Sequence, residues 1–262
     1  MGWKQNIYCF MKNHAPSISN LAIFYFYIFQ SIFSKDPKVM TKKQSQYFGD
    51  GIATTRHVSF LHDPEFMTAY TDSFFNVPKK VGNPNNLDAI WRTHICTWIS
   101  KQVNSLDGDF VECGVWYGLL SKAMCDYIHI DKTNHKFYLF DTWGETSNGD
   151  AHPNYKTDMF DVVKKRFSKF KNVYLFRGLV PAILNQINIE KIVYLGIDMN
   201  GSFAERATLE KYYDKIVPGG IIYFDDYGGK FPDLRKTVDD FFKDKPETLL
   251  HFPTGNSIVI KI

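Results

Sequence analysis

The sequence predicts an α/β fold in which helices cover both faces of a mostly parallel sheet. From about residue 87 onward, short apolar runs alternate with longer stretches whose apolar residues recur at helical spacing. The short runs are almost continuously apolar, as expected for strands that are buried on both faces. The alternation and the continuous apolar runs together are typical of a doubly wound, Rossmann-like sheet.

Six segments are expected to form strands of this sheet. They are residues 109–113, 136–140, 173–176, 192–197, 220–224 and 257–261. The last segment closely follows the turn-forming stretch HFPTGNS, so it is expected to return antiparallel beside its predecessor. Apolar faces at helical spacing lie before and between the strands. Their members are Leu87, Ile90, Trp91, His94, Ile95 and Trp98; Leu120, Ala123, Met124, Tyr127 and Ile128; Phe160, Val163, Phe167 and Phe170; Leu209, Tyr212, Tyr213 and Ile216; and Leu234, Val238, Phe241 and Phe242.

The chain is expected to have two parts. Residues 1–50 are an N-terminal extension, helical or partly mobile, and residues 51–262 form the main domain, with its core from about residue 87. Residues 35–86 are predicted to be rich in loops, because prolines and glycines punctuate them. Residues 21–33 (LAIFYFYIFQSIF) are apolar but shorter than the about 20 residues that span a bilayer. A helix packed on the domain or on a partner subunit is favoured, and peripheral membrane contact is the alternative.

Composition argues against several classes of function. A chain of 262 residues that is 44% hydrophobic can bury one large core. The net charge is only +3 and no block of like charges occurs, so a nucleic-acid partner is not expected. The four cysteines have no paired spacing, which favours reduced thiols and a cytoplasmic location over disulfides or zinc. They are Cys9, Cys96, Cys113 and Cys125.

Charged residues stand at the carboxyl ends of consecutive predicted strands. They are Glu112, Asp141, Arg177, Asp198 and the pair Asp225 and Asp226. In an open parallel sheet the ligand binds outside these strand ends, near the point where the strand order reverses. The sequence therefore predicts that these side chains surround one ligand site.

The turn after the first predicted strand indicates the kind of cofactor. Gly114 and Gly118 are spaced G-x-x-x-G and follow Glu112, whereas a dinucleotide turn has G-x-G-x-x-G and approaches an anionic pyrophosphate. A nicotinamide-dependent oxidoreductase is therefore disfavoured. S-adenosylmethionine (SAM) carries a cationic ammonium and sulfonium and no phosphate, so it suits an acidic turn. Val115 and Tyr117 lie in the same turn and are expected to face the cofactor. In the alternative interpretation, Glu112 only caps the turn.

Two residues after the second predicted strand are candidates for the adenosine half of SAM. Asp141 is placed to accept hydrogen bonds from both ribose hydroxyls, as an acid does there in dinucleotide folds. The alternative is that it caps the segment DTWGE. Trp143 could stack on the adenine or simply pack in the core. Arg177 could hold an acidic partner or pair across the sheet.

Five blocks of the sequence resemble the macrocin O-methyltransferase family. They are DGDFVECGVWYG, FYLFDTWGE, NVYLFRGLVPAIL, YLGIDMNGSFAERATLEKYYDKIVPGGIIYFDDYGG and FPTGNSIVIK. The resemblance covers roughly residues 87–262, with weaker similarity over 57–86. It implies a class I methyltransferase fold with a seven-stranded Rossmann-like sheet, bound SAM and methylation of sugar hydroxyls. In the family members that act on antibiotics it also implies a divalent metal.

The residues themselves also suggest a metal. Neighbouring parallel strands are about 4.8 Å apart, so Asp198 can meet Asp225 and Asp226 if their strands are adjacent. Three clustered carboxylates repel one another unless a cation or protons intervene, and a hard ion such as Mg²⁺ prefers oxygen ligands. Alternation along a strand places Asp225 and Asp226 on opposite faces, so one of them could instead cap the following helix.

The sequence departs from the family pattern at one catalytic position. Family members read D-x-D-L-Y-E-S after the fourth strand, whereas this chain reads DMNGSFAE. Asn200 therefore replaces the second acid, which is the expected general base, and a neutral amide cannot take a proton at neutral pH. The chain resembles a subfamily with D-M-N at this position. Asp198 and Asn200 are the residues expected at the reaction centre.

Three residues are weaker candidates for the site. His94 lies on an apolar helix face, which favours a core histidine. His152, in the segment GDAHPNY, is a candidate base on a loop over the site, and Tyr227 is a candidate for the acceptor pocket.

The predicted function is metal-assisted, SAM-dependent O-methyl transfer to a sugar or a glycosylated small molecule. A homo-oligomer is possible. The alternative is a non-catalytic SAM-binding or scaffold protein that has lost its general base.

Overall fold

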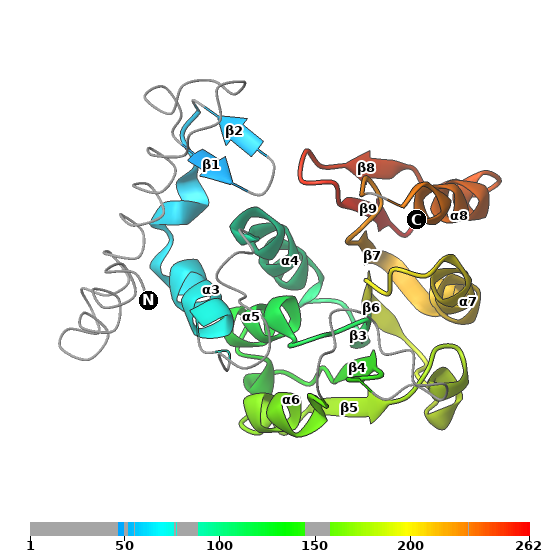
Figure 1. The fold of residues 1–262 in the computed structure, drawn as a ribbon, viewed down its shortest axis with the longest axis horizontal. Helices are drawn as coiled ribbons and strands as arrows, with labels where there is room; N and C mark the ends of the chain where they lie inside the picture. The colour runs from blue at the N-terminus through cyan, green and yellow to red at the C-terminus, as the bar shows by residue number, and fades with distance from the viewer. Residues whose placement is uncertain are drawn as a thin grey trace.

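A computed structural model describes residues 47–49, 52–54, 56–75, 77, 89–144, 158–229 and 231–262. Predictions for residues 21–33, for His152 and for most of the 1–50 extension lie outside this part of the chain. The described residues form a seven-stranded sheet, a small two-stranded sheet and the helices around them (Figure 1). No helix in the described ranges is both long and apolar enough to cross a membrane.

The seven-stranded sheet has the strand order β5-β4-β3-β6-β7-β9-β8. Its strands are β3 (Asp109–Cys113), β4 (Phe137–Asp141), β5 (Val173–Arg177), β6 (Ile192–Ile197), β7 (Ile216–Phe224), β8 (Leu249–His251) and β9 (Ser257–Ile260). The five strands from β5 to β7 are parallel, and β9 runs antiparallel to both β7 and β8. The predicted fold class and the antiparallel return of the last strand are therefore confirmed.

Helices cover both faces of the sheet (Figure 1). On one face lie α3 (Pro64–Phe75), α4 (Ile90–Val103), α5 (Leu119–Tyr127) and α6 (Phe160–Phe167), and on the other lie α7 (Ser202–Tyr212) and α8 (Pro232–Phe242). Each face has its own buried apolar cluster. The described residues also form short 3₁₀ helices: η2 (Ser59–His62), η4 (Ile130–Lys132), η5 (Ala182–Gln186) and η6 (Tyr213–Lys215). The antiparallel pair β1 (Tyr47–Gly49) and β2 (Ile52–Thr54) forms the small sheet.

Helix α3 was not predicted, because the prolines of that region suggested loops. Pro64 is the first residue of the helix, where a proline needs no N–H partner. Asp63 Oδ1 accepts hydrogen bonds from the N–H groups of Glu65 (2.9 Å) and Phe66 (3.2 Å). An N-cap aspartate before a proline was therefore the overlooked evidence for a helix start.

Two details of the C-terminal half also differ from the predictions. Strand β8 is only three residues long, too short for its apolar pattern to stand out. Strand β7 begins at Ile216, which was predicted to lie on a helix face.

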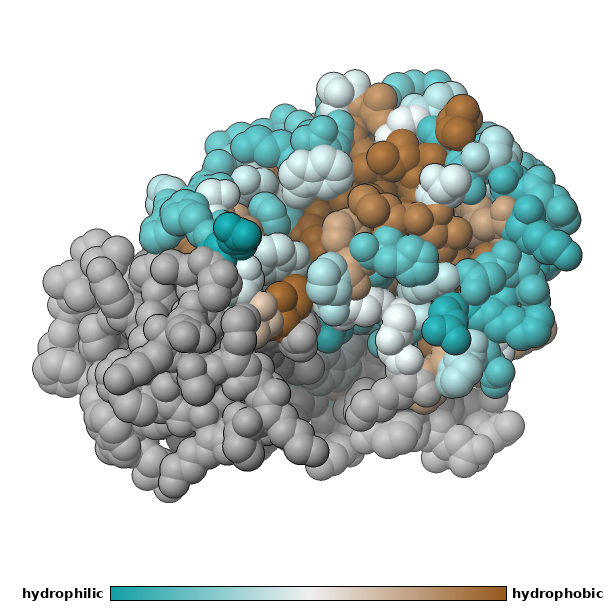
Figure 2. Space-filling view, turned by 90° about the horizontal axis from the view of Figure 1, so that it is seen from above, coloured by the Kyte–Doolittle hydropathy of each residue, from teal (hydrophilic) through white to brown (hydrophobic). Residues whose placement is uncertain are grey.

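Figure 2 shows apolar side chains gathered on the face where the β8–β9 hairpin lies. Leu250 of β8 and Ile260 of β9 are exposed.

Candidate active site

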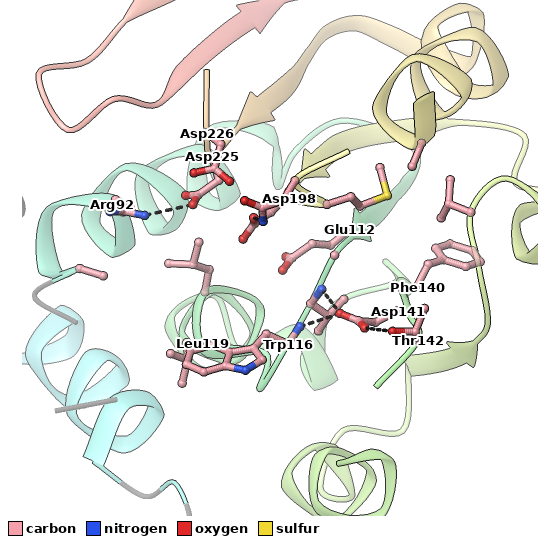
Figure 3. A pocket seen from close by; sticks show the side chains of 18 of the residues that line it. Arg92, Glu112, Trp116, Leu119, Phe140, Asp141, Thr142, Asp198, Asp225 and Asp226 are labelled. Carbon is pink, nitrogen blue, oxygen red and sulfur yellow. Dashed lines mark hydrogen bonds and ion pairs between the residues drawn. The ribbon is translucent and has the colours of Figure 1, made fainter. Parts of the chain in front are cut away.

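A cavity of about 600 Å³ opens at the carboxyl ends of the parallel strands (Figure 3). Eight of the predicted site residues line it: Glu112, Gly114, Val115, Asp141, Asp198, Asn200, Asp225 and Asp226. These residues come from the ends of β3, β4, β6 and β7. Parallel strands explain the convergence, because their carboxyl ends all meet at one edge of the sheet.

The glycine turn packs directly against the end of β6. Gly114 has φ +85°, and a Cβ there would lie 1.7 Å from the main-chain oxygen of Asp198. The Asp198 N–H donates to the carbonyl of Cys113 (2.9 Å), which fixes the two strand ends together. Gly118 has φ +66° and precedes α5, and a Cβ there would meet the Phe167 ring at 2.4 Å. Both glycines are therefore required by backbone conformation and by close approach.

Glu112 is a buried carboxylate that points into the cavity (Figure 3). Its Oε2 atom is enclosed and makes no well-formed hydrogen bond with the described residues. Burial raises the pKa of Glu112 to about 8; the Ser121 hydroxyl opposes this shift, and Asp225 and Asp141 add to it. An enclosed carboxyl oxygen without a well-formed hydrogen bond is costly, so Oε2 indicates a cationic or hydrogen-bonding ligand.

Asp141 holds the glycine turn in place. Its Oδ2 atom accepts hydrogen bonds from the N–H groups of Val115 (2.7 Å) and Trp116 (2.8 Å). Its Oδ1 atom accepts one from the N–H of Trp143 (2.8 Å), and the Thr142 hydroxyl lies 3.5 Å away. Asp141 therefore caps the segment that follows it, which was the alternative interpretation of this residue, and it also binds the glycine turn. Asp141 also lines the cavity, so it lies beside the ligand space while it holds the turn.

Three aspartates form an acidic cluster. Asp198, Asp225 and Asp226 each offer one carboxylate oxygen, and these atoms all lie within 4.8 Å of one another. Burial and then the neighbouring Asp225 raise the pKa of Asp226 to about 6, and burial with both neighbours raises the pKa of Asp198 well above its ordinary value. The expected opposite orientation of Asp225 and Asp226 does not occur, because β7 ends at Phe224 and strand alternation stops there.

Asp225 is held by side chains from three parts of the chain. Its Oδ1 atom accepts hydrogen bonds from the Tyr223 hydroxyl (2.7 Å) and from Asn256 Nδ2 (3.0 Å). Its Oδ2 atom forms an ion pair with Arg92 Nη1 of α4 at 3.0 Å (Figure 3). Arg92 lines the cavity and was missed by the sequence analysis, because nothing in its helical surroundings marks it.

Asn200 lies at the bend between β6 and α7. It has a left-handed φ of +54°, and its Nδ2 atom lies 3.5 Å from Asp198 Oδ1. Glu205 of α7 accepts hydrogen bonds from the N–H groups of Met199 and Asn200, and burial followed by Asp226 raises the pKa of Glu205 to about 7. This buried acid fixes the backbone that presents Asn200 to the cavity.

Four predicted cofactor residues do not line the cavity. Gly118 acts through the backbone as described above, and the Tyr117 ring is buried against Trp116, with centroids 4.8 Å apart. Trp143 is fully buried and its Nε1 donates to the Trp116 carbonyl (2.8 Å), so it has the packing role that was the alternative. Arg177 Nη2 pairs with Asp158 at 2.9 Å. None of these four residues is among those that line the cavity.

Trp116, between the two glycines, does line the cavity. Its left-handed φ of +49° directs it differently from its neighbour, which a linear sequence does not reveal. His94 stacks on Phe60 with centroids 4.0 Å apart, as expected for a core histidine. Tyr227 is buried and donates to Asp239 (2.5 Å), and it is not among the residues that line the cavity.

The sheet order and the cavity at its strand ends define a Rossmann-like fold, which solved methyltransferases share. The family model described as macrocin-O-methyltransferase (TylF) matches residues 94–249, and the chain belongs to this family. It is a SAM-dependent O-methyltransferase. A comparison with curated protein sequences gives no significant match.

Solved structures share the fold at low sequence identity. The O-methyltransferase NovP has a TM-score of 0.54 and 20% identity, with 66% of this chain and 80% of that chain covered. The calicheamicin methyltransferase CalS11 has a TM-score of 0.52 and 16% identity, with 87% and 99% covered. The SAH-bound methyltransferase PaMTH1 of Podospora anserina has a TM-score of 0.53 and 11% identity, with 76% and 88% covered.

Proposed function

We propose that this enzyme transfers the methyl group of SAM to a hydroxyl of a sugar or of a glycosylated small molecule, with assistance from a divalent metal such as Mg²⁺. The observation that carries the proposal is the acidic cluster in the same cavity as Glu112 and the glycine turn. The family supports the acceptor class, and one CalS11 structure is described as a TDP-rhamnose 3'-O-methyltransferase.

The residues of the cavity fit SAM. Glu112 supplies an enclosed carboxylate for the cationic methionine end, which would replace the missing partner of its Oε2 atom. Asp141 lines the cavity beside the turn that it holds, and it would accept a ribose hydroxyl there. Gly114 and Val115 would bring the backbone close to the ligand. Each of these residues contributes binding and orientation rather than proton transfer.

The acidic cluster fits a hard divalent ion. Asp198, Asp225 and Asp226 would hold it, since oxygen ligands are what Mg²⁺ prefers and a cation relieves their mutual repulsion. When bound, such an ion lowers the pKa of a coordinated hydroxyl. Asn200 can orient the acceptor through its amide but cannot take the proton. The acceptor hydroxyl would lie between the cluster and the methyl group, which makes proximity the main contribution of the protein.

The amide at Asn200 also favours a second candidate function, a non-catalytic SAM-binding protein. The two functions differ in turnover and not in cofactor affinity. The deciding experiment measures binding of S-adenosylhomocysteine (SAH) by calorimetry, and then methyl transfer from labelled SAM to a panel of nucleoside-diphosphate sugars and glycosides with Mg²⁺ or EDTA. Metal-dependent transfer to any sugar hydroxyl supports the enzyme. SAH binding without transfer to any acceptor favours the second function, and absent SAH binding contradicts both.

A further inference from the structure

We infer that Arg92 is a built-in counter-ion of the acidic cluster, and that a divalent metal competes with it for Asp225. The inference deepens the proposed function and rests on its metal site. Without a metal, the guanidinium neutralises part of the negative charge at the strand ends. A metal ion that binds there has to displace the guanidinium or tolerate it nearby.

The contacts of Asp225 identify the oxygen for which the two cations compete. Asp225 is buried, and its Oδ1 atom already accepts from the Tyr223 hydroxyl (2.7 Å) and from Asn256 Nδ2 (3.0 Å). Two donors fill the two acceptor positions of that oxygen. Oδ2 accepts only from Arg92 Nη1 (3.0 Å) among the described contacts, so it is the oxygen that remains for a metal.

The two sides of this ion pair differ in their freedom to move. The Asp225 side chain is 8% exposed and held by donors from β7 and from the turn before β9, whereas the Arg92 side chain is 28% exposed. Figure 3 shows Arg92 reaching from α4 at the side of the cavity. Arg92 is therefore the more solvent-exposed partner of the pair, and Asp225 is the one held in position for Asp198 and Asp226.

The positive charge of Arg92 should weaken metal binding at the cluster. A guanidinium cannot lose its proton at any pH at which the protein is folded, so its repulsion of an incoming divalent ion is permanent. Removing that charge takes away the counter-ion that pairs with Asp225 in the cluster. A metal should then bind more tightly, although the fold loses an ion pair.

The test measures Mn²⁺ binding by electron paramagnetic resonance, because Mn²⁺ accepts the same oxygen ligands as Mg²⁺. The proteins are the wild type, Arg92→Met, Arg92→Gln and Arg92→Lys. We expect the two neutral variants to bind Mn²⁺ about tenfold more tightly, the scale for removing one nearby charge, and the lysine variant to stay near wild type. Arg206→Met is the matched control, because it removes an exposed arginine of α7 that pairs with Glu210.

Further variants separate the inference from the metal proposal. Tyr223→Phe should weaken Mn²⁺ binding, because it frees an Oδ1 position and loosens Asp225. Asp198→Asn should abolish Mn²⁺ binding in every background. If the wild type binds Mn²⁺ through Asp198 and the neutral Arg92 variants bind it equally or more weakly, the competition is wrong and the metal site stands. If neither the wild type nor a neutral variant binds Mn²⁺, both are wrong. Mn²⁺ binding only by the neutral variants supports the competition.

Discussion

At the residue scale, Asp141 connects the glycine turn to the cofactor half of the cavity. Asp141→Ala removes an acceptor from the N–H groups of Val115 and Trp116 as well as from the proposed ribose contact. We expect SAH binding to weaken by about 1.5–3 kcal/mol, the range for hydrogen bonds to a charged group. Calorimetry measures the change. Asp158→Ala is the matched control, because it removes an exposed acid outside the cavity.

Asp141→Asn refines this prediction. The asparagine keeps one carbonyl oxygen for the backbone donors, so SAH affinity should fall less than in the alanine variant. Unchanged SAH affinity in both variants would show that Asp141 serves the turn alone.

Gly114 is the position where a single methyl group should be most damaging. Gly114→Ala places a Cβ 1.7 Å from the Asp198 main-chain oxygen and forces an L residue to φ +85°. We expect SAH binding to be lost. We also expect the free energy of unfolding to fall by about 1–3 kcal/mol, the cost of a strained backbone conformation. Calorimetry and thermal unfolding measure the two effects. Gly201→Ala is the control, since among the described residues its Cβ would meet nothing nearer than the Met199 main-chain oxygen at 3.8 Å. Equal damage there would contradict the steric explanation.

Most residues of this cavity can be predicted from the sequence, because residue type and place at a strand end together determine their position. Glu112, Asp141, Asp198 and the Asp225–Asp226 pair all line the cavity as predicted. The turn residues were assigned less well. Whether Tyr117 or Trp116 faces the cavity depends on one left-handed backbone angle, which residue type alone does not set. Arg92 was missed because its role depends on a contact across 133 residues of chain.

At the element scale, α4 carries a histidine that should make the fold sensitive to acid. Burial lowers the pKa of His94 to about 4 from its ordinary 6.5, with Asp63 opposing the shift. The unfolded chain therefore binds a proton more readily than the folded protein between these two values. Stability present at neutral pH should fall as the pH decreases from about 6.5 to about 4.

His94→Phe tests this pH dependence. Phenylalanine can keep the stacking on Phe60 and has no proton to bind. Denaturant unfolding between pH 7.5 and 4 should show a smaller loss of stability for the variant than for the wild type. Parallel curves for the two proteins would assign the acid sensitivity to other groups.

The elements that sequence reasoning missed share a physical cause. Helix α3 is marked by its cap and first proline rather than by a break in the loop pattern, and β8 has three residues and depends on β9 for its pairing. The predicted strands succeeded because burial on both faces makes them continuously apolar. The prediction that Asp225 and Asp226 point to opposite faces was wrong, because side chains alternate only inside a strand and β7 ends at Phe224.

At the scale of the whole molecule, strand order joins the two halves of the cavity. Strands β3 and β6 are neighbours, and from them the sheet continues through β4 in one direction and through β7 in the other. The cofactor half is built on β3 and β4, and the acidic cluster on β6 and β7. The two halves meet where Gly114 packs against the main chain of Asp198. The halves therefore share a backbone contact but use different side chains.

This arrangement predicts that the two halves can be separated by mutation. Asp198→Ala removes a carboxylate of the acidic cluster but keeps the main-chain oxygen that packs on Gly114. We expect turnover to be abolished while SAH affinity stays within about twofold, less than 0.5 kcal/mol, because the turn and Glu112 are unchanged. Turnover is followed by methyl transfer from labelled SAM, and affinity by calorimetry.

Asp198→Asn and EDTA complete the test at this scale. The amide keeps the shape of the side chain, so loss of turnover in this variant as well would assign the effect to charge. EDTA should reduce wild-type turnover and leave SAH binding intact. If EDTA and both variants leave turnover unchanged, the acidic cluster has no metal role. A fall in SAH affinity together with turnover would contradict the separation of the two halves. The Asp198 carboxylate would then contribute to cofactor binding as well as to the acidic cluster.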